Sequence, residues 1–108
     1  MRMDDYARKK KSEMLEVARL MLAGRCDLIE GCRRIASLGS LLDVEDDPAI
    51  IPFRGFASET DRFPRGDVRR DYAHDFLGRL DGEADEYLKE VRTEILRSCG
   101  DLLSRFGG

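Results

Sequence analysis

The stretch EADEYLKEVRTEILRSCGDLLSRF, residues 83–106, has the most regular pattern of apolar side chains in the sequence. Apolar residues recur there every three or four positions, as they do on one face of an α-helix. These residues are Leu88, Val91, Ile95, Cys99, Leu102 and Phe106. Tyr87, Leu96 and Leu103 widen the face to about half of the helix circumference at 100° per residue. A helix with so wide an apolar face has to contact at least two neighbours, so the sequence predicts a long central helix over 83–106.

A second amphipathic helix is predicted near the N-terminus, over residues 5–23. Its polar side carries charged residues, and its apolar side consists of Ala7, Met14, Ala18, Met21 and Leu22. Asp4 or Asp5 is expected to cap its start, because a carboxylate there accepts hydrogen bonds from free backbone N–H groups. Gly24 is expected to end it in the left-handed conformation.

A third helix is predicted to open at Asp27, because Asp27 and Glu30 have the spacing of a capping box. We expect Gly39 to terminate it. Its apolar stripe consists of Leu28, Ile29, Cys32, Ile35 and Ala36. Glu30, Arg33 and Arg34 fall on the opposite side, where their spacing suits an ion-pair cluster. Since only about three residues link this helix to the preceding one, the two are expected to form an antiparallel hairpin.

Neither the helical nor the strand period fits residues 40–66, which contain three prolines. A structureless segment of this length is rare in a small domain unless it packs against the core. It has apolar residues with which to pack: Ile50, Ile51, Phe53 and Phe56. We therefore expect a long packed loop across the bundle, with one short helical turn after Pro48, where proline suits a first helical position.

A short helix is predicted to begin at Asp67, with Asp75 and Arg79 as an ion pair on its surface. Its apolar stripe would be Val68, Tyr72, Phe76 and Leu80. Together these segments predict an all-α fold in a single domain over 1–108: a small four-helix arrangement with a helical hairpin, a short helix and a long C-terminal helix. The core is expected to contain Leu28, Ile35, Leu88, Val91, Ile95, Cys99 and Leu102.

The charge balance argues against nucleic acid as a partner. The chain has 19 Lys and Arg and 22 Asp and Glu, for a net charge of −3, and its one basic cluster is residues 8–11. No apolar run approaches the roughly 20 residues that a bilayer span requires, so no membrane association is expected. The N-terminal residues lack the apolar centre of a signal peptide, and a cytoplasmic location is therefore expected.

The cysteines and the histidine do not have the spacing of a metal site, and no cofactor is expected. Cys26, Cys32 and Cys99 contain no C-x-x-C pair, so they are interpreted as buried free thiols of a reduced compartment. His74 follows Asp71 by three residues, which is half of a di-iron helix motif. The sequence contains no second such motif, and His74 is expected at the surface.

The most site-like residues lie in the irregular stretch 53–64: Ser58, Glu59, Asp61 and Arg62. In one interpretation they are structural. Ser58 and Asp61 have the spacing that starts a helix, and Glu59 or Asp61 pairs with an arginine such as Arg33, Arg34 or Arg62. In the alternative interpretation, Glu30 lies beside Glu59 and Asp61 and the carboxylates bind a divalent cation.

Two segments, DLIEGCR (residues 27–33) and SETDRFP (residues 58–64), carry a resemblance to a known group. In these segments the chain resembles small uncharacterised bacterial proteins of a domain-of-unknown-function family, over roughly residues 15–106. The resemblance implies a bacterial source and a helical fold. It implies no activity.

The sequence leaves two main functional hypotheses open. The first is a non-catalytic interaction protein of the bacterial cytoplasm, immunity- or adaptor-like, whose acidic surface attracts a basic protein partner. The second is a small enzyme or ligand-binding protein built on Glu30, Arg33, Glu59 and Asp61, with the loop as a lid. A pocket lined by these groups would support the second, and their dispersal in surface ion pairs the first. A domain that only oligomerises remains a third reading, and the wide apolar face over 83–106 predicts a homodimer.

Overall fold

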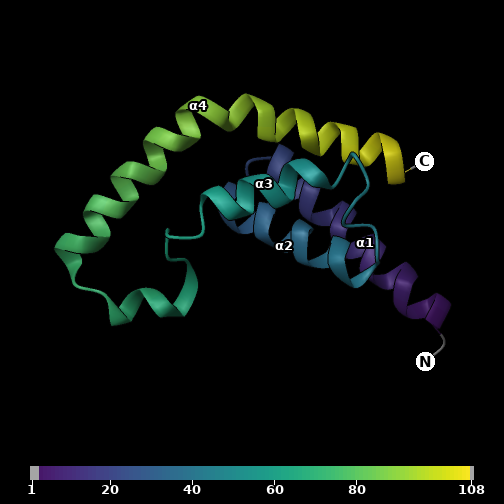
Figure 1. The fold of residues 1–108 in the computed structure, drawn as a ribbon, viewed down its shortest axis with the longest axis horizontal. Helices are drawn as coiled ribbons and strands as arrows, with labels where there is room; N and C mark the ends of the chain where they lie inside the picture. Colours follow the sequence, from purple (N-terminus) through teal and green to yellow (C-terminus); the bar gives the residue numbers. More distant parts are fainter. Residues whose placement is uncertain (1–2, 108) are drawn as a thin grey trace.

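The computed structural model describes residues 3–107, and within them every regular element is helical (Figure 1). The all-α prediction is thereby confirmed. The elements are α1 (Met3–Leu22), α2 (Leu28–Leu41), α3 (Ile51–Glu59), the 3-10 helix η1 (Gly66–Asp71) and α4 (His74–Phe106). No helix in this part of the chain is both long enough and apolar enough to cross a membrane.

The hairpin of α1 and α2 forms as its sequence signals predict. Gly24 has a φ of +73°, and the N–H of Arg25 donates to the carbonyl of Leu20 over 2.8 Å. At the start of α2 the Asp27 carboxylate accepts the N–H of Glu30 over 2.9 Å, which makes Asp27 the N-cap. The predicted caps of α1 differ, because Asp4 and Asp5 lie inside its first turn.

Gly39 does not end α2, contrary to the prediction. It is buried inside the helix, and a Cβ on it would lie 2.8 Å from Cγ2 of Ile50. Glycine is therefore needed there for close packing, and the helix continues to Leu41. The left-handed residue after the helix is Asp43, with a φ of 57°, and the N–H of Val44 donates back to the carbonyl of Gly39 over 2.9 Å. This is the hydrogen bonding of a Schellman motif.

The expected long loop over 40–66 contains a helix, α3, so this prediction is wrong in part. Pro52 lies in the first turn of α3, where its missing N–H costs nothing. Phe53 and Phe56 are buried in the main core, and their burial stabilises a nine-residue helix that has little helical periodicity of its own. Ser58 does not start a helix, because it lies in the last turn of α3 and Thr60 is the C-cap.

The short helix predicted from Asp67 does not form. Residues 66–71 make the 3-10 helix η1, an extended Tyr72 and Ala73 follow, and α4 then continues for 33 residues without a break at Gly82. A glycine inside a helix costs about 1 kcal/mol, and burial of Leu80 and Ala84 on either side offsets that cost.

Two apolar clusters hold the elements together. The main cluster joins α1, α2, α3 and the second half of α4, and the smaller one joins the first half of α4 to the bundle through Ile29, Phe63, Leu80 and Ala84. Five of the seven predicted core residues are buried, whereas Leu88 and Val91 are half-buried at the edge. Leu96 and Leu103 also pack on the main cluster, so the apolar face predicted to bind a second copy is largely filled within one chain.

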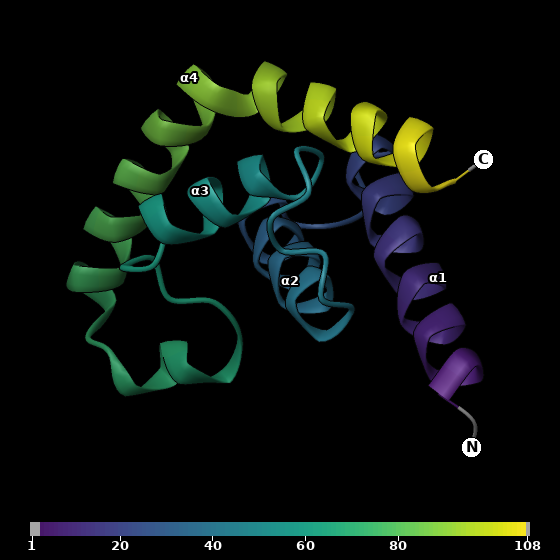
Figure 2. The same ribbon diagram turned by 45° about the vertical axis from the view of Figure 1, so that its right-hand side comes forward.

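Residues 66–79, which we call the arm, lie away from the main cluster. The arm consists of η1 and the first turns of α4, and Figures 1 and 2 both show it at the end of α4 opposite the C-terminus. The whole molecule is elongated, with extents of 47 × 30 × 24 Å. The arm is attached to the bundle by the smaller cluster and by the polar contacts described next.

Candidate functional site

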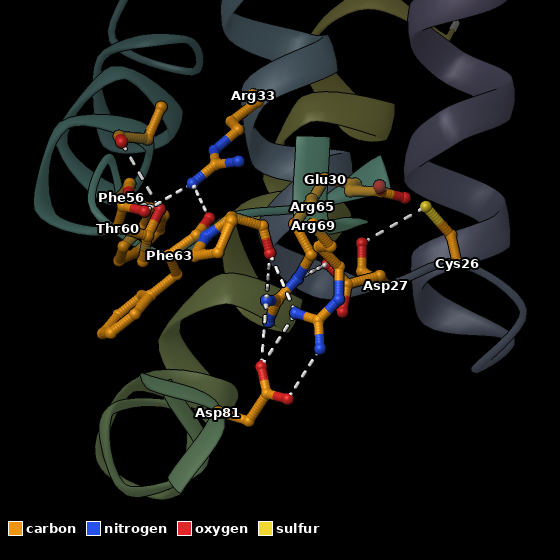
Figure 3. A network of polar contacts seen from close by, with 12 residues as sticks. Cys26, Asp27, Glu30, Arg33, Phe56, Thr60, Phe63, Arg65, Arg69 and Asp81 are labelled. Atoms are coloured by element: carbon orange, nitrogen blue, oxygen red, sulfur yellow. Dashed lines mark hydrogen bonds and ion pairs between the residues drawn. The ribbon is translucent and has the colours of Figure 1, made fainter. Parts of the chain in front are cut away.

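Arg33 connects α2 to the segment that follows α3. Its side chain is half-buried, and Nη2 donates to the backbone carbonyls of Thr60 and Phe63, the latter over 2.7 Å (Figure 3). Thr60 is buried and its hydroxyl donates to the carbonyl of Phe56 over 2.8 Å. The guanidinium of Arg33 therefore donates hydrogen bonds to backbone carbonyls that lie outside the helices. Its role in the structure is to position the chain after α3.

A second set of polar contacts holds the arm. Arg69 donates twice to the Asp81 carboxylate, over 2.9 and 2.8 Å, and once to the carbonyl of Pro64 over 3.1 Å (Figure 3). Arg65 donates through Nε to Asp27 over 3.1 Å, and its Nη1 lies 3.9 Å from Asp81. The same Asp27 carboxylate caps α2, so these contacts join the start of α2, the arm and α4.

The Arg69 pair affects the titration of Asp81. The two hydrogen bonds from Arg69 hold the pKa of the Asp81 carboxyl below its usual range, because they favour the charged form. No spacing in the sequence identifies Arg65, Arg69 or Asp81 as site residues. Arg69 and Asp81 are 12 residues apart on different elements, and no helical spacing rule connects them.

The predicted ion-pair cluster of Glu30, Arg33 and Arg34 does not form. Arg34 instead pairs with Glu13 of α1 over 3.0 Å, and the carboxylate of Glu30 is exposed. Arg62, another predicted site residue, lies 3.5 Å from Glu83 of α4.

Glu59 does not pair with an arginine within the described residues; it accepts a hydrogen bond from the Tyr87 hydroxyl over 2.6 Å. This contact links the end of α3 to α4. Partial burial, and secondly the bond to Glu59, raise the pKa of Tyr87, so its hydroxyl stays a donor at neutral pH. Ser58 and Asp61 are exposed on the same segment.

The alternative metal interpretation has no geometric support in residues 3–107. They contain no group of three or more His, Cys, Asp and Glu side chains that could hold a metal ion, so Glu30, Glu59 and Asp61 do not form one. A surface cavity of about 700 Å³ lies along α1, and among the predicted site residues only Arg34 lines it. A second cavity, of about 640 Å³, is lined by Asp81 and by residues of the arm, which are Arg69, Arg70, Tyr72, His74, Leu77 and Gly78.

The thiols are poor candidates for nucleophiles. Burial raises the pKa of Cys32 to about 12 and that of Cys99 to about 11, which keeps both protonated at neutral pH. Cys26 is half-buried, and its pKa is raised as well, first by burial and then by Asp27. His74 is exposed at the start of α4, as predicted.

The arm exposes three large apolar side chains, which we call the aromatic corner: Val68, Tyr72 and Phe76. Their exposed fractions are 48%, 39% and 40%. The rings of Tyr72 and Phe76 are stacked, with centroids 5.7 Å apart and planes 14° apart, and the Arg79 guanidinium lies 5.8 Å from the Phe76 ring. The sequence pattern placed these residues on a buried stripe, and that prediction is wrong because η1 and the break at Tyr72 turn them away from the bundle.

A comparison with family models identifies one family for the chain. The model described as "Protein of unknown function (DUF2489)" matches residues 4–102. The chain belongs to this family. The resemblance found at residues 27–33 and 58–64 is thereby confirmed at the level of a domain-of-unknown-function family. Searches of curated proteins and of solved structures found no match.

In this DUF2489 chain the charged side chains near the predicted site mostly join one element to another. Arg33 contacts backbone carbonyls, Arg34 and Arg62 pair with acids of α1 and α4, and Glu59 accepts from Tyr87. The aromatic corner differs from them, because its three side chains have apolar surface in water and no role in either apolar cluster.

Proposed function

We propose that this protein is a non-catalytic protein–protein interaction module of the bacterial cytoplasm, with an immunity- or adaptor-like role. Its contact surface is the aromatic corner. The observation that carries the proposal is the exposure of Val68, Tyr72 and Phe76 together on the arm, outside both apolar clusters. Grouped exposed apolar side chains mark binding surfaces, whereas single ones are ordinary.

The composition of the aromatic corner is that of a surface that contributes much of the free energy of binding. Aromatic residues and arginine dominate the few positions that contribute most to protein interfaces, and here Arg79 lies beside two aromatic rings. The stacked rings of Tyr72 and Phe76 hold one another in place. A partner would therefore meet a surface that is already ordered, and binding would lose less side-chain entropy.

The remaining charged residues favour an interaction role over a catalytic one. Arg33, Arg34, Arg62 and Glu59 are engaged in contacts between elements rather than directed into a shared pocket. Dispersal of this kind is what an interaction domain tolerates and an active site does not.

The proposal is tested by affinity capture from the native host with three tagged proteins. They are the unmodified chain, the double variant Tyr72→Ser/Phe76→Ser, and the control Tyr6→Ser/Leu22→Ser, whose positions are similarly exposed on α1 (39% and 45%). We expect a stoichiometric protein partner with the unmodified chain and the control, and recovery reduced at least about tenfold with the corner variant. Equal recovery with all three proteins would contradict the corner as the contact, provided that circular dichroism shows all three folded.

A further inference from the structure

The arm has balanced charge, unlike the chain as a whole. Residues 66–79 contain three carboxylates and three guanidiniums, whereas the whole chain has a net charge of −3. The carboxylates are Asp67, Asp71 and Asp75, and the guanidiniums are Arg69, Arg70 and Arg79. Arg69 is paired with Asp81 and Arg70 with Asp67 within the chain, so Asp71, Asp75 and Arg79 are the charged groups of the arm without such a pair among the described residues. A partner with a strong net positive or net negative charge would require a surface of the opposite charge. An interspersed surface of both signs can instead match itself.

Asp75 and Arg79 are arranged for such self-matching. They lie four residues apart on α4 and therefore face the same side, next to Phe76. The predicted ion pair between them is absent: within residues 3–107 neither side chain forms an ion pair, and Arg79 lies over the Phe76 ring instead. Both side chains are exposed and available to a second molecule.

A twofold arrangement brings these groups together. When two helices pack antiparallel about a twofold axis at the level of Leu77, midway between positions 75 and 79, position 75 of one copy lies opposite position 79 of the other. Each Asp75 then lies next to the Arg79 guanidinium of the other copy, so the dimer contains two such ion pairs. The two Phe76 rings lie next to the axis. The contact buries the aromatic corner of both copies at once, which removes its apolar surface from water.

We propose that the occupant of the aromatic corner is a second copy of this chain, in a symmetric dimer formed by antiparallel packing of the first turns of α4. The inference rests on the proposed function in one respect, namely that the corner is a protein contact. It assigns the homodimer to the arm, and not to the apolar face of residues 83–106 from which the sequence predicted it, because that face is largely filled by α1, α2 and α3.

The test uses charge reversal on the full chain, followed by sedimentation equilibrium. The unmodified chain should show a mass that rises with concentration from 12.3 kDa towards twice that value. In Asp75→Arg, two guanidiniums of one copy face two guanidiniums of the other, and in Arg79→Asp carboxylates face carboxylates in the same way. Because like charges repel, each variant alone should dimerise on the order of tenfold more weakly. An equimolar mixture of the two variants should regain dimer, and so should the double variant Asp75→Arg/Arg79→Asp.

Two outcomes overturn the dimer. One is a 12.3 kDa particle for the unmodified chain up to millimolar concentration. The other is a dimer that neither charge reversal nor Phe76→Ser weakens, which would place the interface elsewhere. Circular dichroism confirms that each variant is folded. A monomeric unmodified chain that still loses its captured partner through Tyr72→Ser/Phe76→Ser would refute the dimer and leave the proposed function standing.

Discussion

Arginine side chains form most of the polar contacts that attach the arm to the bundle. Arg65 and Arg69 reach Asp27 and Asp81, and Arg33 holds two carbonyls of the intervening chain. A bidentate pair such as Arg69–Asp81 is geometrically specific as well as attractive. The cap formed by Asp27 was predictable because it is local, three residues from its partner. The pairs of Arg65 and Arg69 were not, because they depend on how distant elements pack.

Replacement of Asp81 by asparagine should lower the melting temperature of the protein in a pH-dependent way. The pKa of Asp81 is lowered by its hydrogen bonds with Arg69, so its charged form stabilises the fold above the carboxyl pKa of the unfolded chain, which is about 4. This contribution is lost as the pH falls from there through the lower folded-state pKa. The melting temperatures of Asp81→Asn and the unmodified chain should differ at pH 7, and the difference should shrink progressively as the pH falls below about 4.

The control for this measurement is Asp85→Asn, one turn further along α4. Asp85 is exposed and forms no ion pair with another described residue. Its replacement should leave the melting temperature near that of the unmodified chain at both pH values. A constant difference for Asp81→Asn across the pH range would show that the loss does not come from the charged pair.

At the scale of elements, strong periodicity was a reliable guide and weak periodicity was not. The long helix over 83–106 and the hairpin of α1 and α2 were predicted from apolar spacing. Two predictions that rested on glycine and proline were wrong. Gly39 was expected to end α2, and residues 40–66 were expected to form a loop. In both cases tertiary packing decides, because Gly39 lies against Ile50 and α3 buries Phe53 and Phe56. The continuity of α4 through Gly82 has the same cause.

The contact between α3 and α4 through Glu59 and Tyr87 predicts a measurable coupling. Glu59→Ala and Tyr87→Phe should each lower the free energy of unfolding, and the double variant should lower it by less than the sum. The difference should be about 0.5–1.5 kcal/mol, the usual contribution of a hydrogen bond. Asp61→Ala is the control and should stay within about 0.5 kcal/mol of the unmodified chain. Denaturant unfolding of the four proteins and the control gives these values; zero coupling would contradict a structural role for Glu59.

At the scale of the molecule, α4 serves two regions. Its second half fills the core. Its first half extends to the arm and is attached to the bundle by the smaller cluster, the arginine contacts and the hydrogen bond between Tyr87 and Glu59. The sequence could not show this division, because Val68, Tyr72 and Phe76 have the spacing of a buried helical stripe. Only the formation of η1 in place of an α-helix leaves them exposed. The sequence could not show the contacts of the predicted charged residues either. Arg34, Arg62 and Glu59 contact residues of α1 and α4, and only the fold determines those pairings.

The central claim is that the aromatic corner contacts protein in the cell. The most direct measurement replaces Tyr72 with a photo-crosslinking phenylalanine analogue in the native host, with the same replacement at Tyr6 as the control, because both side chains are 39% exposed. After illumination, the account predicts a discrete adduct of higher mass from position 72, containing a partner protein or a second copy of this chain, and little or none from position 6. No adduct from position 72, or equal adducts from both positions, would contradict the claim.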